Sequence, residues 1–176
     1  DWFGISIDSA QPDVLEALGR APHGGAIRPE QYIDLSRRLR ATGVRLKLNT
    51  VVTALNVDED LRPFVEALAP ERWKVFQVMR VNGQNDRDTD GLLIDDQAFA
   101  RFVERNRDVG VTFVAESNAV MSGSYAMLDP AGRFFDNTTG THRYSRPVLQ
   151  VGVEEAFRDV AFDTGKFEAR GGSYAW

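Results

Sequence analysis

The chain has 176 residues, of which 43% are apolar and 27% charged, and this composition is ordinary for a soluble globular protein with a substantial core. Its net charge of −5 argues against general nucleic-acid binding, and its sequence contains no membrane-length apolar run and no secretory signal. The absence of cysteine excludes disulfides, thiolate zinc sites, a cysteine nucleophile and a cysteine-bound iron–sulfur cluster within these residues, and it fits a cytoplasmic location.

Short β-rich segments alternate along the chain with amphipathic segments. We expect strands, in chain order, at residues 3–9, 44–52, 73–81 and 111–116. We expect helices at residues 13–20, 29–42, 58–68 and 95–107. After these elements, the segments 125–129 and 133–136 flank a Pro-Ala-Gly turn and predict a hairpin, and a short helix is expected at 153–160.

Strands that alternate with helices predict a parallel sheet with helical crossovers, and therefore an α/β fold. Four such strands do not close an eight-unit barrel, so we expect part of an open barrel or a small doubly wound sheet. The first residues already read as a strand without an initiator Met, which indicates an excised or trimmed chain. We expect a barrel portion at residues 1–118 and a C-terminal extension at residues 119–176, which holds the hairpin and the short helix.

Two successive strands carry cations within otherwise apolar sequence. Because alternate residues of a strand face opposite sides, Lys47 and Asn49 share one face with Arg45, and Arg72 shares a face with Lys74. A parallel strand is normally apolar on both faces and burial of unpaired charge is costly, so these cations need anionic partners. We favour a phosphorylated ligand at the carboxyl ends of the strands. The alternative is that the cations lie at an edge or pair with Asp8, Glu66 or Glu116.

Other candidate residues carry weaker signals. Ser6 shares a face of the first strand with Asp8, and Arg20 follows soon after, so they could bind a polar cofactor or be an ordinary serine and a surface arginine. Tyr125 could be a site hydroxyl, although a core position is the better default. No spacing of the two histidines indicates a metal site, and no phosphate-binding glycine loop, dinucleotide fingerprint or nucleophile–histidine pair is present.

Several motifs occur in a characteristic order, and the most specific is Arg-Trp-Lys-Val-Phe-Gln at residues 72–77. The others lie at residues 6–9, 47–52, 56–60, 116–118, 124–125, 151–156 and 170–172. Together they resemble the viperin family of radical S-adenosylmethionine enzymes, and more closely its prokaryotic viperin-like members, over essentially the whole chain. The resemblance implies the later strands of a partial (β/α)6 barrel with a C-terminal extension.

The resemblance also implies an activity for the whole protein. A [4Fe–4S] cluster and S-adenosylmethionine would generate a 5′-deoxyadenosyl radical that takes the ribose 4′ hydrogen of CTP, UTP or GTP. The product would be a 3′-deoxy-3′,4′-didehydro nucleotide with an antiviral role. The family's CxxxCxxC cluster motif and its Gly-Gly-Glu segment are absent here, so we expect the chain alone to be inactive and, with strands missing, to self-associate.

Matching positions imply individual roles within this family. Lys47, Arg72 and Lys74 would hold the triphosphate, and Asn49 would contact the nucleotide. Ser6 and Arg20 would contact S-adenosylmethionine, and Tyr125 would lie near the substrate sugar. Two alternatives remain open, namely a different radical enzyme with the same barrel and a non-catalytic module that binds nucleotides or other proteins.

Overall fold

The computed structural model describes residues 1–21, 25–86 and 89–173, which form two compact units. The first unit comprises residues 1–78 and 92–116, and the second comprises residues 79–91 together with the chain from Ser117 onward. The segment 79–91 therefore groups with the second unit, although it lies between strands of the first in the sequence.

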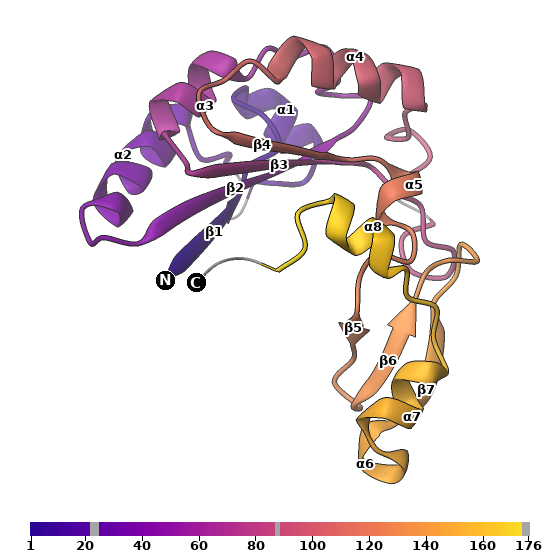
Figure 1. Cartoon of the computed structure of the whole chain (residues 1–176). Helices are drawn as coiled ribbons and strands as arrows, with labels where there is room; N and C mark the ends of the chain where they lie inside the picture. The colour runs from indigo at the N-terminus through magenta and orange to yellow at the C-terminus, as the bar shows by residue number, and fades with distance from the viewer. Residues whose placement is uncertain (22–24, 87–88, 174–176) are drawn as a thin grey trace. The chain divides into compact units, whose positions relative to one another are not determined.

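The first unit alternates strands with helices, as predicted (Figure 1). Its strands are β1 (Trp2–Ser6), β2 (Arg45–Val52), β3 (Arg72–Gln77) and β4 (Thr112–Glu116). Its helices are α1 (Pro12–Ala17), α2 (Pro29–Arg40), α3 (Arg62–Leu68) and α4 (Asp96–Asn106). All neighbouring strands are parallel and their order is β1-β2-β3-β4. The predicted α/β class and the parallel sheet are therefore confirmed.

Two strands end earlier than predicted because side chains replace the backbone pairing. β1 ends at Ser6 rather than at residue 9, since the carboxylate of Asp8 accepts a hydrogen bond from the Val51 amide at 2.8 Å. β3 ends at Gln77 rather than at residue 81. Beyond it, the Asn85 side chain accepts from the Val81 amide at 2.8 Å and donates to the Met79 carbonyl at 2.9 Å.

The prediction that a helix begins at residue 58 is wrong, because α3 begins at Arg62. Residues 54–58 form turns instead, and the Asn106 side chain accepts a hydrogen bond from the Leu61 amide at 2.8 Å. Pro63 stands in the first turn, where its missing N–H has no helical partner to lose.

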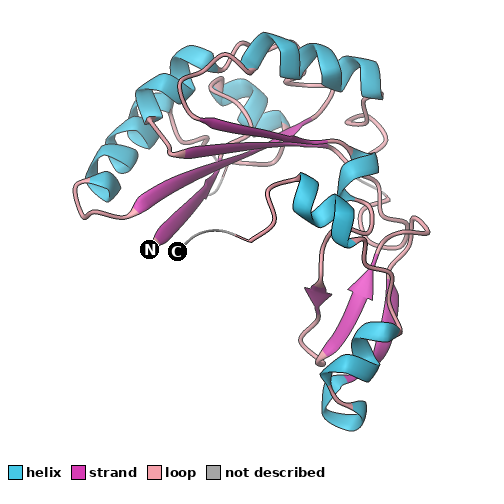
Figure 2. Cartoon of the chain, in the orientation of Figure 1, coloured by secondary structure: helices cyan, strands magenta, loops and turns pink. Residues whose placement is uncertain are grey.

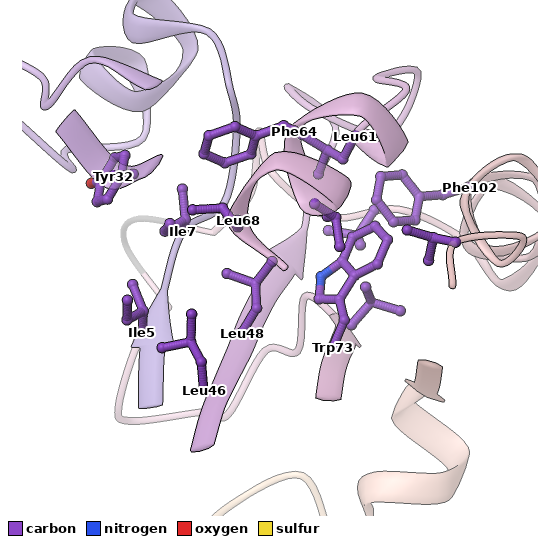
Figure 3. Close-up of a cluster of buried hydrophobic side chains, with 14 of the residues drawn as sticks. Ile5, Ile7, Tyr32, Leu46, Leu48, Leu61, Phe64, Leu68, Trp73 and Phe102 are labelled. Atoms are coloured by element: carbon purple, nitrogen blue, oxygen red, sulfur yellow. The ribbon is translucent and has the colours of Figure 1, made fainter. Parts of the chain in front are cut away.

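The helices of the first unit lie along one face of the sheet (Figure 2). Sequential strand order with crossovers of one hand places successive helices on the same side. Figure 3 shows Leu46, Leu48 and Trp73 directed from the strands toward Phe64 and other apolar side chains of the helices. The Trp73 side chain is 0% exposed, and its Nε1 donates to the Thr50 hydroxyl at 3.0 Å. Strand residues at the intervening positions therefore face away from the helices.

The second unit contains an antiparallel sheet of three strands in the order β5-β6-β7. These strands are β5 (Met127–Leu128), β6 (Arg133–Asp136) and β7 (Arg143–Pro147). Its helices are α5 (Asn118–Met121), α6 (Val148–Val151), α7 (Val153–Arg158) and α8 (Thr164–Ala169). The predicted hairpin and the predicted helix at 153–160 are confirmed, although the helix is shorter. The sequence analysis missed β7, α5, α6 and α8.

Across the described part of the chain, no helix combines the length and the apolar character needed to cross a bilayer.

Candidate functional site

The face of the parallel sheet opposite the helices carries the predicted cations. The register aligns Lys47 of β2 with Arg72 of β3, and Asn49 with Lys74. Ser6 of β1 aligns with Asn49. Residues in register on adjacent parallel strands share a face about 5 Å apart. We define the polar face as the set of six residues Ser6, Lys47, Asn49, Arg72, Lys74 and Glu116.

The predicted division of β2 into two faces is confirmed. Leu46 and Leu48 are buried against the helices, whereas Lys47 and Asn49 are partly exposed on the other side. The predicted adjacency of the two cation-bearing strands is confirmed as well, since β2 and β3 pair directly. The structure thus brings four of the proposed nucleotide-binding residues together.

Lys74 and Glu116 form a buried ion pair on the polar face. Lys74 is 4% exposed and Glu116 is 0% exposed, and Lys74 Nζ donates to Glu116 Oε1. Lys74 Nζ also lies 5.9 Å from the centre of the Phe76 ring. A buried cation needs a counter-ion, and Glu116 supplies one for Lys74. For Lys74, the pairing that the sequence analysis kept as an alternative is therefore present.

Two further cations, Lys47 and Arg72, belong to the polar face besides the pair of Lys74 and Glu116. Three cations and one carboxylate leave the six residues of the polar face with an excess of positive formal charge. Excess positive charge on a partly shielded surface favours an anionic ligand with several charged groups, such as a chain of phosphates.

Asn49 contributes an unused hydrogen-bond acceptor. Its Oδ1 atom is buried and has no hydrogen-bond partner among the described residues. Most buried polar atoms in proteins are hydrogen-bonded, so an exception calls for an explanation. Asn49 lies in register between Ser6 and Lys74. The acceptor would suit a ligand donor such as a ribose hydroxyl or a base amino group.

The two residues predicted to contact a cofactor lie near the carboxyl end of β1. Ser6 is the last residue of that strand and is exposed. Arg20 follows α1, and its Nε donates to Asp8 Oδ2 at 2.8 Å. The Arg20 side chain is 56% exposed. Asp8 is thus an ion-pair partner of Arg20, which the sequence pattern alone did not indicate.

A buried amide holds the same end of the sheet together. Asn56 is 2% exposed, and its Nδ2 donates to the carbonyls of Asp8 and Val51. Its Oδ1 accepts from the Thr53 amide at 2.7 Å. Asn56, the first residue of the motif at 56–60, therefore has a structural role, because its hydrogen bonds fix the chain after β1 and β2.

Tyr125 belongs to the second unit and is partly exposed, so its default placement in a core is wrong. The Arg170 guanidinium lies 3.8 Å from the centre of the Tyr125 ring, and Arg170 Nη2 donates to the Ser124 carbonyl at 3.0 Å. Lys166 Nζ donates to the carbonyls of Ala119 and Ser122. Two cations at the end of the chain therefore fix the segment around Tyr125, and the sequence analysis had singled out neither.

A [4Fe–4S] cluster does not fit the residues of this chain. Such clusters are held mainly by cysteine thiolates, and the sequence has none. Within the described ranges, no group of three or more histidine, aspartate or glutamate side chains could hold a metal ion. Thiolate ligands would have to come from outside these 176 residues.

Sequence comparison finds relatives along the whole chain, although no protein-family model matches it. The chain is 44% identical over 177 residues to an S-adenosylmethionine-dependent nucleotide dehydratase of Lacinutrix mariniflava, and covers 37% of that protein. It is 43% identical to a protein of the same name from Flammeovirga pacifica, of which it covers 60%. It is 38% identical to the S-adenosylmethionine-dependent nucleotide dehydratase RSAD2 of Oncorhynchus mykiss, of which it covers 51%.

The chain therefore spans about half the length of the curated relatives that it matches. A solved structure, that of Streptococcus suis SuiB, aligns with a TM-score of 0.44 and 16% identity over 65% of this chain and 27% of that one. Along its whole length, the chain is therefore 38–44% identical to part of each of these S-adenosylmethionine-dependent nucleotide dehydratases.

Proposed function

We propose that this chain is the substrate-binding part of an S-adenosylmethionine-dependent nucleotide dehydratase, and that its polar face holds a nucleoside triphosphate. The observation that carries the proposal is the register of β2 and β3, which pairs Lys47 with Arg72 and Asn49 with Lys74. The relatives are named nucleotide dehydratases, which supports a nucleotide substrate.

Each of the four residues has a chemical role in this proposal. The guanidinium of Arg72 and the ammonium groups of Lys47 and Lys74 would bind phosphate oxygens through charge-assisted hydrogen bonds. Asn49 Oδ1, buried without a partner in the described structure, would accept from the sugar or the base. The candidate nucleotides are CTP, UTP and GTP.

We propose that the parallel sheet is part of a (β/α)6 barrel whose other strands lie outside this chain. In a barrel, helices cover the outer face of the sheet and the inner face lines the interior. Helices along one face and ligand-type side chains on the other support this arrangement. A doubly wound sheet would instead carry helices on both faces.

Ser6 and Arg20 would hold S-adenosylmethionine at the carboxyl end of β1. The exposed Ser6 hydroxyl can donate and accept hydrogen bonds, and the exposed part of the Arg20 guanidinium can bind a carboxylate. Bound S-adenosylmethionine would be the source of the 5′-deoxyadenosyl radical that takes the ribose 4′ hydrogen, and the one electron needed to release that radical and methionine would come from a cluster held by residues outside this chain. Tyr125, held by Arg170, would lie near the sugar.

The whole protein would form a 3′-deoxy-3′,4′-didehydro nucleotide with an antiviral role in the cytoplasm. The chain by itself would bind nucleotide without turnover, because it supplies no cysteine for a cluster. Iron–sulfur reconstitution of these 176 residues is therefore expected to give no cluster absorbance and no cleavage of S-adenosylmethionine. A cluster band with turnover would contradict this expectation.

Calorimetric titration of the whole protein with CTP, UTP and GTP tests the nucleotide site. Lys47→Met and Arg72→Met should each weaken binding by about 1.5–3 kcal/mol, the scale of a charge-assisted hydrogen bond. Arg38→Met is the matched control, because Arg38 is an exposed cation of α2 on the helix side of the sheet. Affinity unchanged in both test variants would overturn the assignment. Binding without any dehydration would favour a non-catalytic nucleotide-binding module.

A further inference from the structure

We propose that Asp8 is a positioning residue that fixes the Arg20 guanidinium for the carboxylate of an amino-acid group, such as the methionyl end of S-adenosylmethionine. This inference rests on the cofactor site proposed above. Asp8 lies two residues after the end of β1 and is 4% exposed, so it reaches a ligand only through Arg20.

The Asp8 carboxylate is held in a single orientation. Its Oδ1 accepts from the Val51 amide of β2 at 2.8 Å, and its Oδ2 accepts from Arg20 Nε at 2.8 Å. Its backbone carbonyl accepts from the buried Asn56 amide group. Rotation of the carboxylate would break one of two hydrogen bonds in a buried setting, and each such loss is unfavourable.

The backbone of Arg20 is held as well. Its amide donates to the Leu15 carbonyl at 2.7 Å, directly after Gly19, which adopts a φ of 70°. A positive φ favours glycine, and here it ends α1 and turns the chain toward Asp8. With the backbone and Nε both fixed, the guanidinium plane has little freedom.

The remaining guanidinium edge suits a carboxylate. A guanidinium has five N–H groups in a rigid plane, and the contact with Asp8 uses the one on Nε. The side chain is 56% exposed, so the terminal nitrogens are accessible to a ligand. A planar pair of N–H donors matches the two oxygens of a carboxylate.

The charge of the site favours a zwitterionic amino-acid group over a triphosphate. Asp8 offsets the charge of Arg20, so the pair has no excess of positive formal charge, unlike the polar face. The charges of Asp8 and Arg20 also act on the Tyr32 hydroxyl. Burial raises the pKa of Tyr32 above its ordinary value and Asp8 raises it further, whereas Arg20 opposes the shift. A net-neutral site would bind a polyanion weakly and a zwitterion well.

Nuclear magnetic resonance of the chain tests the positioning directly. The Arg20 Nε–H signal should exchange slowly with water in the wild-type chain and rapidly in Asp8→Asn, whose amide keeps the acceptor for Val51 but turns a donor toward Arg20. Asp34→Asn is the control, since Asp34 pairs with Arg37 on the exposed surface of α2. An unchanged Arg20 signal in folded Asp8→Asn would overturn the inference.

Titration of the whole protein with S-adenosylmethionine tests the consequence. Asp8→Asn and Arg20→Lys should each weaken binding at least tenfold, and the double variant should be no weaker than Arg20→Lys alone. Asp34→Asn should bind as the wild type does. If Asp8→Asn fails to fold, Arg20→Lys alone tests the planar donor edge, and wild-type affinity in that variant would contradict it.

The titration distinguishes failure of the positioning role of Asp8 from failure of the assignment of Arg20 to the cofactor. Wild-type affinity in Asp8→Asn together with a large loss in Arg20→Lys would overturn the positioning role while the cofactor assignment stood. Wild-type affinity in both variants would overturn the assignment of Arg20 to the cofactor, and the inference with it.

Discussion

Asn49 and Lys74 are direct neighbours across β2 and β3, yet their polar atoms are satisfied in different ways. Lys74 Nζ donates to Glu116 within the protein, whereas Asn49 Oδ1 is buried without a partner among the described residues. The charge of Lys74 is therefore paired within the protein. Asn49 Oδ1, in contrast, is an acceptor to which a ligand could donate a hydrogen bond. This difference leads to opposite expectations for stability.

Removal of the Glu116 charge should destabilise the chain. Glu116→Gln leaves Lys74 buried without a counter-ion, and we expect a loss of about 3 kcal/mol in the free energy of unfolding. The double variant Lys74→Met/Glu116→Gln should recover more than half of that loss, because no buried charge remains. Urea denaturation of the single and double variants measures both values. Equal stability of Glu116→Gln and wild type would show that the pair is not maintained in solution.

Replacement of Asn49 should lower nucleotide affinity without lowering the stability of the fold. Asn49→Leu removes a buried acceptor that has no partner in the described structure, so the free energy of unfolding should stay the same or rise by up to about 1 kcal/mol. Nucleotide affinity of the whole protein should nevertheless fall at least tenfold.

Thr50→Val provides the matched control in the same strand. The Thr50 hydroxyl donates to the Ile7 carbonyl at 2.8 Å and accepts from Trp73 Nε1 at 3.0 Å. Its loss leaves two buried groups unpaired and should cost about 1–3 kcal/mol of stability. A loss of stability in Asn49→Leu as large as in Thr50→Val would mean that Asn49 Oδ1 has a structural partner.

Periodicity alone was sufficient to predict the sheet and the face that carries the cations. Leu46 and Leu48 alternate with Lys47 and Asn49, and this alternation fixes which side chains share a face whatever the neighbouring strands are. The pairing of Lys74 with Glu116 depends on the register between strands about 40 residues apart, which local pattern does not encode.

Strand ends and the surroundings of Tyr125 were harder to predict for the same reason. β1 ends where the Asp8 side chain takes the place of a backbone partner, and hydrophobic periodicity contains no signal for that exchange. α5 and α6 have four residues each, too few to show a helical repeat. The stacking of Arg170 on Tyr125 joins positions that only the folded chain brings together.

Acid should weaken one ion pair of the second unit. Arg146 lowers the pKa of Asp159 to about 2 through side-chain and backbone hydrogen bonds. A depressed folded-state pKa contributes stability above the unfolded value of about 3.9, and this contribution is lost as the pH falls toward 2. Carbon-detected titration of the Asp159 carboxyl should show a midpoint near 2 in the wild type. In Arg146→Met the midpoint should return toward 3.9, and an unchanged midpoint would contradict the assigned cause.

The two outer strands of the parallel sheet should promote self-association. β1 and β4 lie at the ends of the strand order, and in the described structure neither pairs with a further strand. Exposed strand edges are templates for pairing with another chain. Light scattering of the chain should therefore show a mass that rises with protein concentration.

Two substitutions that introduce lysine identify the surface through which the chain self-associates. Phe3 of β1 is 44% exposed, and Phe3→Lys places a charge at the edge strand, so it should reduce the association. Leu149 of α6 is 98% exposed and belongs to the second unit rather than to the parallel sheet, so Leu149→Lys should leave an association through the sheet edges unchanged. The opposite result would assign the contact to the apolar surface of the second unit. A concentration-independent monomer in the wild type would show that both sheet edges are protected in solution.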